Sequence, residues 1–140
     1  MRLTRVYRFS ASHRLHAPSL SEDDNQRLYG KCNNPYGHGH NYVLHVSVSG
    51  RTDPVTGRVV NPATLDRHVE ERVLRVYDHR DINSDVLNFE GVPTTENLAR
   101  DIARRLCNGW SQTVSVARLE RVLIQETGRN KFELRMNGNK

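Results

Sequence analysis

The sequence predicts an α+β fold in which two helices lie on one face of an antiparallel four-stranded sheet. Four segments alternate apolar and polar residues as strands do, namely residues 2–10, 40–50, 113–126 and 131–136. Two segments with apolar residues at helical spacing lie between the second and third of these strands. Because strands and helices come in blocks rather than in regular alternation, we expect both helices on one side of the sheet.

The second strand carries the clearest alternation and is expected to have one wetter face. Its apolar face is predicted to consist of Tyr42, Leu44, Val46 and Val48. Residues 53–57 then read Asp-Pro-Val-Thr-Gly, in which Pro presets one backbone angle and Gly permits a positive one. We therefore expect a hairpin, with residues 58–60 as its second strand.

Capping residues predict where both helices begin. Asn61 before Pro62 indicates the first start, since Asn caps free backbone N–H groups and Pro suits the first helical position. The second helix is expected to begin near Thr94 or Thr95. Residues 18–37 are rich in Ser, Asp, Asn, Gly and Pro, and are predicted to form one long loop.

The bulk properties of the chain restrict its class. A length of 140 residues fits one domain, so residues 1–140 are assigned to a single domain. No segment has a signal-peptide pattern or approaches the roughly 20 apolar residues of a membrane helix. We therefore expect a cytoplasmic protein with reduced thiols at Cys32 and Cys107 and with no membrane partner.

The charge of the chain favours an anionic ligand. The formal net charge is +5, but the basic residues are scattered and match no nucleic-acid-binding module. A small phosphorylated substrate accounts for this charge as well as a nucleic acid does. We expect the former and no specific nucleic acid.

The spacing of His38 and His40 suggests a metal site. Two positions apart on a segment that enters a strand, both rings point to the same side. Zinc in catalytic sites is typically held by three protein ligands, with one position open. His13 follows the first strand, and an antiparallel neighbour would place it beside the pair. Spacing alone leaves four other histidines open as the third ligand: His16, His45, His68 and His79.

Four further residues have chemistry suited to a catalytic site. Cys32 lies in a polar loop, and a nearby cation or metal would favour its thiolate, although a small packed thiol is the alternative. Asp78 precedes His79 directly, where a carboxylate can orient an imidazole, but helix ends also carry histidine for dipole reasons. Glu126 projects from a largely apolar strand face, where a carboxylate is costly unless it is paired or meets a ligand.

Five motifs together resemble the 6-pyruvoyltetrahydropterin synthase family. They are FSASHRL at 9–15, GKCNNPYGHGHNY at 30–42, DHRDIN at 78–83, PTTEN at 93–97 and QETG at 125–128. Their order and spacing along almost the whole chain are specific. The resemblance implies the tunnelling fold, in which trimers stack into homohexamers with active sites between subunits.

The resemblance also implies roles for the candidate residues. The implied zinc ligands are His13, His38 and His40. Cys32 would abstract a proton, with Asp78 and His79 as its relay partners. Glu126 would anchor the pterin, since one carboxylate can accept two parallel N–H donors. Additional pterin contacts are implied at Thr94 and Thr95, and candidates for binding the triphosphate are Arg14, Lys31, Arg80 and Arg129.

The activity implied by the resemblance is zinc-dependent conversion of 7,8-dihydroneopterin triphosphate to 6-pyruvoyltetrahydropterin, with elimination of triphosphate. Two alternatives remain open. Relatives of the same fold make a carboxylated tetrahydropterin for queuosine synthesis, but usually with a shorter gap than the five residues between Cys32 and His38. A non-catalytic zinc or nucleic-acid binding module would not need Cys32, Asp78 and Glu126 together.

Overall fold

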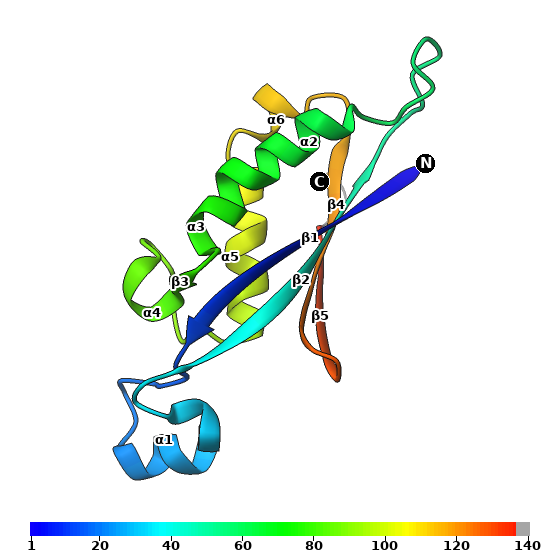
Figure 1. Cartoon of the computed structure of the whole chain (residues 1–140). Coiled ribbons are helices and arrows are strands. Elements are labelled where there is room, and N and C mark those ends of the chain that lie inside the picture. Colours follow the sequence, from blue (N-terminus) through cyan, green and yellow to red (C-terminus); the bar gives the residue numbers. More distant parts are fainter. Residues whose placement is uncertain (137–140) are drawn as a thin grey trace.

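Two long antiparallel strands, β1 (Arg2–His13) and β2 (His38–Ser49), run through the centre of the structure (Figure 1). The computed structural model describes residues 1–136, so the last four residues of the predicted domain, 137–140, lie outside it. Strand β4 (Arg118–Thr127) pairs with β2, and β5 (Asn130–Arg135) pairs with β4, both antiparallel. These four strands confirm the antiparallel part of the predicted sheet.

The sheet also contains a fifth strand that the sequence analysis did not predict. Strand β3 (Arg80–Asp81) runs parallel to the end of β1, with Arg80 opposite Ala11, and the strand order is β3-β1-β2-β4-β5. The sheet is therefore mixed, and the expectation of a purely antiparallel sheet of four strands is wrong in this detail. Two residues are too few to show an alternating pattern, so only the pairing to β1 reveals this strand.

Helices cover one face of the sheet, as predicted (Figure 1). The first helix of this layer is continuous and consists of α2 (Pro62–Val69), a π-helical turn (Glu70–Leu74) and α3 (Arg75–Tyr77). The second is α5 (Thr95–Cys107). Both predicted caps form, since Asn61 accepts from the Ala63 N–H at 3.0 Å and Thr94 accepts from the Asn97 N–H at 3.2 Å.

The core lies between these helices and the sheet. The predicted apolar face of β2 is confirmed, since all four of its residues are fully buried. Fully buried side chains on the helices face them: Leu65, Val69, Val73, Leu98, Ile102 and Leu106. Each such side chain contributes about 1.5–3 kcal/mol by leaving water, so the helical layer is held mainly by apolar burial.

A buried polar network also joins α3 to α5. The Tyr77 hydroxyl donates to the Asp101 carboxylate, which accepts the Arg105 Nε–H at 2.6 Å as well. Burial raises the pKa of Tyr77 well above its ordinary value, and the Asp101 carboxylate raises it further, so the hydroxyl keeps its proton. Tyr77 is the last residue of α3, and the network therefore fixes the point from which Asp78 and His79 leave the helix.

Two predictions about the connecting segments are wrong. The predicted loop 18–37 contains α1 (Glu22–Tyr29) and a 3₁₀ turn (Gly30–Asn33). Its polar composition concealed a capped start, in which Ser21 accepts from the Asp24 N–H at 3.1 Å ahead of an acidic first turn. At 53–57 the turn forms, but residues 58–60 build no strand, and Val60 instead packs into the core before α2.

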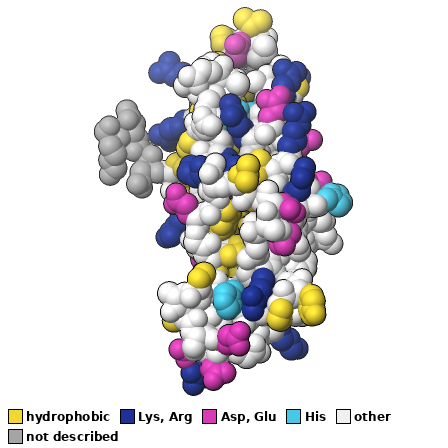
Figure 2. All heavy atoms as spheres, turned by 90° about the vertical axis from the view of Figure 1, so that its left-hand side faces the viewer, with side chains coloured by type: hydrophobic (Ala, Val, Ile, Leu, Met, Phe, Trp, Pro, Cys, Tyr) yellow, Lys and Arg dark blue, Asp and Glu magenta, His cyan; other side chains and the backbone are white. Residues whose placement is uncertain are grey.

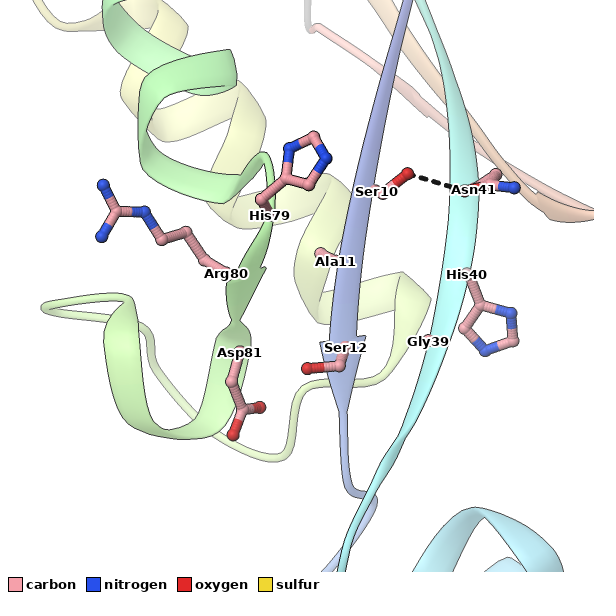
Figure 3. A pocket seen from close by; sticks show the side chains of 9 residues that line it. All are labelled: Ser10, Ala11, Ser12, Gly39, His40, Asn41, His79, Arg80 and Asp81. Carbon is pink, nitrogen blue, oxygen red and sulfur yellow. Dashed lines mark hydrogen bonds between the residues drawn. The ribbon is translucent and has the colours of Figure 1, made fainter.

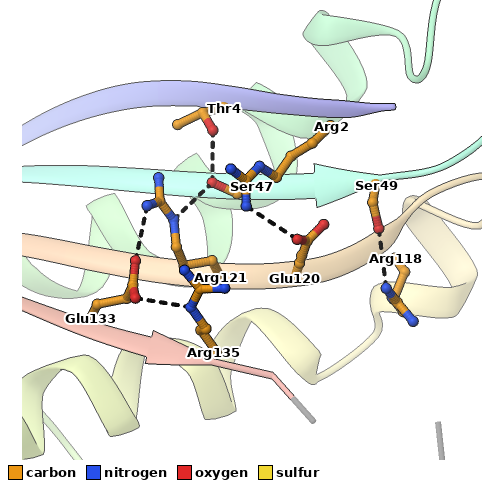
Figure 4. Close-up of polar contacts among 9 residues, drawn as sticks. All are labelled: Arg2, Thr4, Ser47, Ser49, Arg118, Glu120, Arg121, Glu133 and Arg135. Atoms are coloured by element: carbon orange, nitrogen blue, oxygen red, sulfur yellow. Dashed lines mark hydrogen bonds and ion pairs between the residues drawn. The ribbon is translucent and has the colours of Figure 1, made fainter. Parts of the chain in front are cut away.

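The face of the sheet away from the helices is polar (Figure 4). Arg121 donates to Ser47 at 3.2 Å and to Glu133 at 2.9 Å, and Ser47 also pairs with Thr4 at 2.7 Å. On the side shown in Figure 2, basic and acidic side chains are interspersed, as the scattered charges of the sequence predict. In residues 1–136, none of the helices combines the length and apolar character that crossing a membrane requires.

The remaining helices are short. They are α4 (Ile82–Asp85) and α6 (Trp110–Thr113), the first following β3 and the second following α5. Helix α4 begins with Asp81 as its cap, whose carboxylate accepts from the Asn83 N–H at 3.3 Å. The segment between β3 and α5 therefore returns the chain to the end of the sheet where β1 finishes and β2 begins (Figure 1).

Candidate functional site

Three histidines gather where β1 ends and β2 begins. The register pairs His13 with His38 and Ala11 with His40, so the alternation of the strands brings all three rings to one face. Their candidate ligand atoms lie within 4.8 Å of one another. This group of His13, His38 and His40 could hold a metal ion, as the spacing and the antiparallel pairing predict.

The structure excludes the other histidines from this cluster. His45 is on the opposite face of β2, and His68 is buried between helices, where its Nε2 lies 2.8 Å from the Leu106 carbonyl. His16 is 3.0 Å from the Asn33 amide through its Nδ1. The His79 side chain is 82% exposed and lines a pocket that His40 also lines, but it is not a member of the group that could share a metal ion. Among the described residues, His13 is therefore the third member of the group.

Burial favours the neutral form of two of the three imidazoles, those of His13 and His38. His13 is 2% exposed, and this burial lowers its pKa to about 4, with the neighbouring His38 and His40 acting in the same direction. Burial also lowers the pKa of His38, and His40 adds to the effect. A metal ion binds imidazole only in its neutral form, so the lowered pKa values of His13 and His38 favour metal binding by these two rings.

The orientation of His13 suits a metal ligand. Its Nδ1 lies 2.8 Å from the Pro93 carbonyl, which can only accept, so Nδ1 carries the proton and Nε2 presents its lone pair. The two Nε2 atoms of His13 and His38 are 3.2 Å apart. Tetrahedral zinc with bonds of about 2.0–2.1 Å places its ligand nitrogens about 3.3 Å apart. The donor set and spacing fit a divalent ion of this kind.

Glu126 stands beside the cluster on β4. Its Oε1 is 3.3 Å from the His40 Nε2, and the Thr95 hydroxyl donates to its other carboxylate oxygen. Thr95 is 2% exposed, whereas Thr94 serves as the cap of α5. The structure thus joins Thr95 to Glu126 and gives Thr94 a structural contact to the helix.

Cys32 lies at the rim of the cluster, in the 3₁₀ turn. It lines a pocket of about 620 Å³ that also contains Lys31 and His38. Burial raises the pKa of the Cys32 thiol, and the negative charge of Glu126 raises it further. The thiol is therefore protonated at neutral pH, and a positive charge or a base must approach before it becomes a thiolate.

Asp78 and His79 follow α3 and lie away from Cys32. His79 has a positive φ of 60°, a conformation that non-glycine residues seldom adopt, and its N–H donates to the Ser10 carbonyl at 2.6 Å. Asp78 Oδ1 accepts from the Ser10 N–H at 2.9 Å and lies 3.1 Å from the His79 Nδ1. The carboxylate thus orients the exposed imidazole and is itself anchored to β1.

Figure 3 shows the pocket that His79 lines, which has a volume of about 340 Å³. The His79 ring projects on the β3 side of β1, and the His40 ring lies beyond β2 and points away from it. Cys32 is not among the residues that line this pocket. Within one chain, the structure brings Cys32 and Glu126 to the histidine cluster but leaves His79 apart from them.

The four basic candidates for a triphosphate are dispersed. Lys31 lines the Cys32 pocket, and Arg80 lines the His79 pocket. Arg14 donates through Nε to the Asn33 carbonyl at 3.0 Å, and Arg129 is exposed in the turn between β4 and β5. Lys31 thus shares a pocket with Cys32 and His38, and Arg80 shares one with His40 and His79.

Sequence reasoning missed two contacts that shape the site. The Pro93 carbonyl fixes the His13 tautomer, and Glu126 approaches His40 directly. Pro93 belongs to the PTTEN motif, so the motif pointed to the right segment, but no side-chain pattern reveals a backbone acceptor. The approach of Glu126 depends on the register between β2 and β4, which pairs Leu44 with Ile124.

Known proteins resemble this chain over most of its length. A family model described as 6-pyruvoyl tetrahydropterin synthase matches residues 2–137. A 6-pyruvoyl tetrahydrobiopterin synthase of Poecilia reticulata is 53% identical over 98 residues, which cover 69% of this chain and 67% of that protein. The Homo sapiens protein of the same name is 43% identical over 129 residues, covering 91% of this chain and 86% of the relative.

A solved structure agrees with these sequence matches. The structure of Caenorhabditis elegans 6-pyruvoyl tetrahydropterin synthase superposes with a TM-score of 0.87 at 39% identity, covering 98% of this chain and 96% of the other. The agreement extends over nearly every element described above.

The lowered pKa of His13 predicts how the stability of the metal-free protein depends on pH. Below about pH 6.5 the unfolded chain takes up a proton that the folded protein binds only near pH 4. The free energy of unfolding should therefore be highest above about 6.5 and fall by roughly 3 kcal/mol by pH 4 through this group. Urea unfolding at several pH values measures it, and His13→Asn should remove this part of the pH dependence. If the free energy of unfolding falls equally steeply with decreasing pH in both proteins, His13 is not buried in its neutral form.

Proposed function

The chain belongs to the 6-pyruvoyl tetrahydropterin synthase family, and we infer that it converts 7,8-dihydroneopterin triphosphate to 6-pyruvoyltetrahydropterin, with loss of triphosphate, in tetrahydrobiopterin biosynthesis. The observation that carries this inference is the three-histidine cluster with Glu126 directly beside it. Family membership rests on the match over residues 2–137 and on identities of 43–53% to synthases. A binding module without catalysis is not favoured by either observation.

Zinc is the proposed metal, held by His13, His38 and His40. All three donors are imidazole nitrogens, which zinc accepts readily, and three such ligands leave a fourth position for the substrate. Bound there, zinc would supply a positive charge that polarises a hydroxyl or developing carbonyl on the substrate side chain. The Pro93 carbonyl supports the assignment because it holds the His13 ring with Nε2 directed toward His38.

Glu126 is the proposed anchor of the pterin ring. A carboxylate can accept the exocyclic amino group and the adjacent ring N–H as two parallel hydrogen bonds. The Thr95 hydroxyl already donates to one of its oxygens, which holds the carboxylate in place before a ligand arrives. Because Glu126 also lies 3.3 Å from His40, the anchored ring would sit within reach of the metal. Thr94 contributes by starting the helix that carries Thr95.

Cys32 is the proposed residue that removes a proton from the substrate side chain. Its raised pKa means that the thiol needs help to ionise. We assign this help to His79, whose exposed imidazole is oriented by Asp78. After accepting the thiol proton, His79 would be stabilised by that carboxylate, and Cys32 could then take the proton from carbon.

The separation of Cys32 from His79 supports an active site shared between subunits. His79 is held in its conformation by backbone contacts to β1, while its ring projects into solvent. The sheet also has open edges, since β3 pairs with β1 at only two residues and β5 pairs on one side only within residues 1–136. Open edges allow further strands to pair. We propose the homohexameric tunnelling assembly of the family, built from this domain of residues 1–140 and working in the cytoplasm.

The main alternative is the formation of a carboxylated tetrahydropterin from the same substrate. The geometry of the site suits both reactions, because the histidine cluster and Glu126 would serve either one. Incubation with 7,8-dihydroneopterin triphosphate and mass identification of the product separates them. We expect the mass of 6-pyruvoyltetrahydropterin and release of triphosphate. A carboxylated product would replace the proposed function, and no product would refute both.

Replacing both His38 and His40 with Ala should abolish metal binding and turnover, because a single remaining imidazole cannot retain zinc. The purified protein should carry about one zinc per chain. Metal analysis after gel filtration measures this occupancy. His45→Ala is the matched control, because His45 lies on the same strand and faces the other way. Full zinc occupancy in the double variant would contradict the site.

Glu126→Gln should weaken binding of a pterin analogue by about 2–4 kcal/mol, because it removes one side of a charged hydrogen-bond pair. Zinc content should not change. Calorimetric titration with neopterin measures the loss, and Glu120→Gln serves as the control, since Glu120 pairs with Arg2 on the outer face of the same strand. Unchanged affinity would make Glu126 a structural carboxylate.

Mixed oligomers test the shared site. Homo-oligomers of Cys32→Ala and of His79→Ala should each be nearly inactive, because residues that act as one unit fail when either is lost. Co-refolded mixtures should recover roughly a quarter of wild-type turnover, because random assortment restores some intact sites. Mass spectrometry confirms the exchange of subunits. No recovery despite exchange would place both residues in one chain's site or remove one from catalysis.

A further inference from the structure

The short segment of residues 14–16, directly after His13, is held between two asparagines that the proposed chemistry does not use. Asn33 follows Cys32 in the 3₁₀ turn, and Asn83 lies in α4, just beyond the turn that carries His79. Both belong to motifs of the sequence, KCNNP and DHRDIN, but neither has a role in the mechanism above. Asn33 contacts all three residues of the segment, and Asn83 contacts Arg14.

Asn33 forms the first set of contacts. It is 5% exposed, and its amide nitrogen lies 2.7 Å from the Leu15 carbonyl and 3.0 Å from the His16 Nδ1. Its own carbonyl accepts from the Arg14 Nε–H at 3.0 Å. Because a buried amide that loses its partners costs about 1–3 kcal/mol, these contacts hold the turn firmly against the segment.

The same connection reaches Cys32 through the backbone. The Leu15 N–H donates to the Cys32 carbonyl at 2.8 Å. Leu15 is two residues from His13, whose ring belongs to the histidine cluster. The location of the thiol relative to the cluster is therefore set through one short stretch of chain.

Asn83 holds the other side of the segment. Its Oδ1 accepts from the Arg14 N–H at 2.7 Å, and its amide donates to the Arg14 carbonyl at 3.0 Å. These two bonds resemble the pairing of two strands and hold the Arg14 backbone directly after the end of β1. Asp81 caps the turn in which Asn83 stands, so the anchor is itself fixed to β3.

We propose that Asn33 is a positioning residue that holds Cys32 at the histidine cluster, and that Asn83 is a second one. Residues 14–16 together with these two asparagines are called the frame below. This inference rests on the proposed role of Cys32 in proton abstraction. Asn33 does not touch the reacting atoms; it acts by limiting where the thiol can lie. A misplacement of about 1 Å can cost roughly 100-fold in rate, so such a frame matters for turnover.

The test measures the position of the thiol and the turnover separately. Asn33→Ala and Asn33→Asp both remove the amide donors, and the second keeps the size of the side chain. Each should lower kcat by roughly 10- to 100-fold while KM stays within about threefold and zinc content is unchanged. Alkylation of Cys32 by iodoacetamide should become at least about threefold faster, because the released turn exposes the thiol.

Cys107 provides an internal standard for the alkylation. It is the other cysteine of the chain, it is exposed at the end of α5, and peptide mapping follows both thiols in one sample. A lower kcat together with a higher ratio of Cys32 to Cys107 alkylation supports the frame. Two results overturn it. If neither thiol is alkylated faster, Cys32 has stayed in place; if both are accelerated equally, the variant is generally unfolded.

Two further variants distinguish a local change at Cys32 from a general loss of folding. Asn83→Ala changes an exposed residue, and it should raise the alkylation ratio and lower kcat in the same way but by a smaller factor. Asn61→Ala is the matched control, since it removes a helix cap at the opposite end of the molecule (Figure 1) and should lower thermal stability without changing the ratio. If Asn61→Ala alters the ratio as Asn33→Ala does, the frame is refuted.

Failure of the proposed function gives a different result. Cys32→Ala that retains full turnover would refute proton abstraction by Cys32 but would not change how Asn33 controls the alkylation ratio. Conversely, an inactive Cys32→Ala variant with an unaltered ratio in Asn33→Asp would keep the function and reject the frame.

Discussion

The antiparallel pairing of β1 with β2 is the constraint on which the site depends. The ladder is unbroken from Arg2 opposite Ser49 to His13 opposite His38. Because side chains alternate along each strand, a shift of one residue would turn one strand's histidines to the other face. The buried face of β2, with Tyr42 and Leu44 next to the cluster, resists such a shift because it would expose apolar surface to water. Packing of the core thus secures the geometry of the three histidines.

Burial has opposite consequences for the groups of the site. It keeps His13 neutral, which prepares the ring for a metal ion, and it keeps Cys32 protonated, which delays its use as a base. A metal charge in the cluster would oppose the effect of Glu126 on the thiol, because the two charges have opposite signs. The proposed chemistry therefore begins only when the metal, the substrate and a basic imidazole are present together. This arrangement protects a reactive thiol in the empty enzyme.

Asp78 and His79 are held in a defined conformation, yet His79 does not contact the histidine cluster of its own chain. Tyr77 secures the end of α3 through Asp101, and the Ser10 backbone holds the next two residues. With these contacts the chain maintains a positive φ at His79, an arrangement that costs on the order of 1 kcal/mol for a side chain with a Cβ. The ring nevertheless remains exposed. In the proposed assembly, His79 completes the active site of a neighbouring subunit.

The sequence by itself determined the α+β class, the two helix starts at Asn61 and Thr94, and the identity of the residues that form the cluster with Glu126. These features depend on local periodicity, on capping and on short motifs, each of which is contiguous in the chain. Strand β3, helix α1 and the approach of Glu126 to His40 were decided only by tertiary structure. A two-residue strand exists through its partner, and a polar helix such as α1 leaves no apolar stripe to detect. Contacts between β2 and β4 depend on a register that no local pattern encodes, since the paired residues, such as Val43 and Gln125, lie far apart in the chain and meet only when the sheet forms.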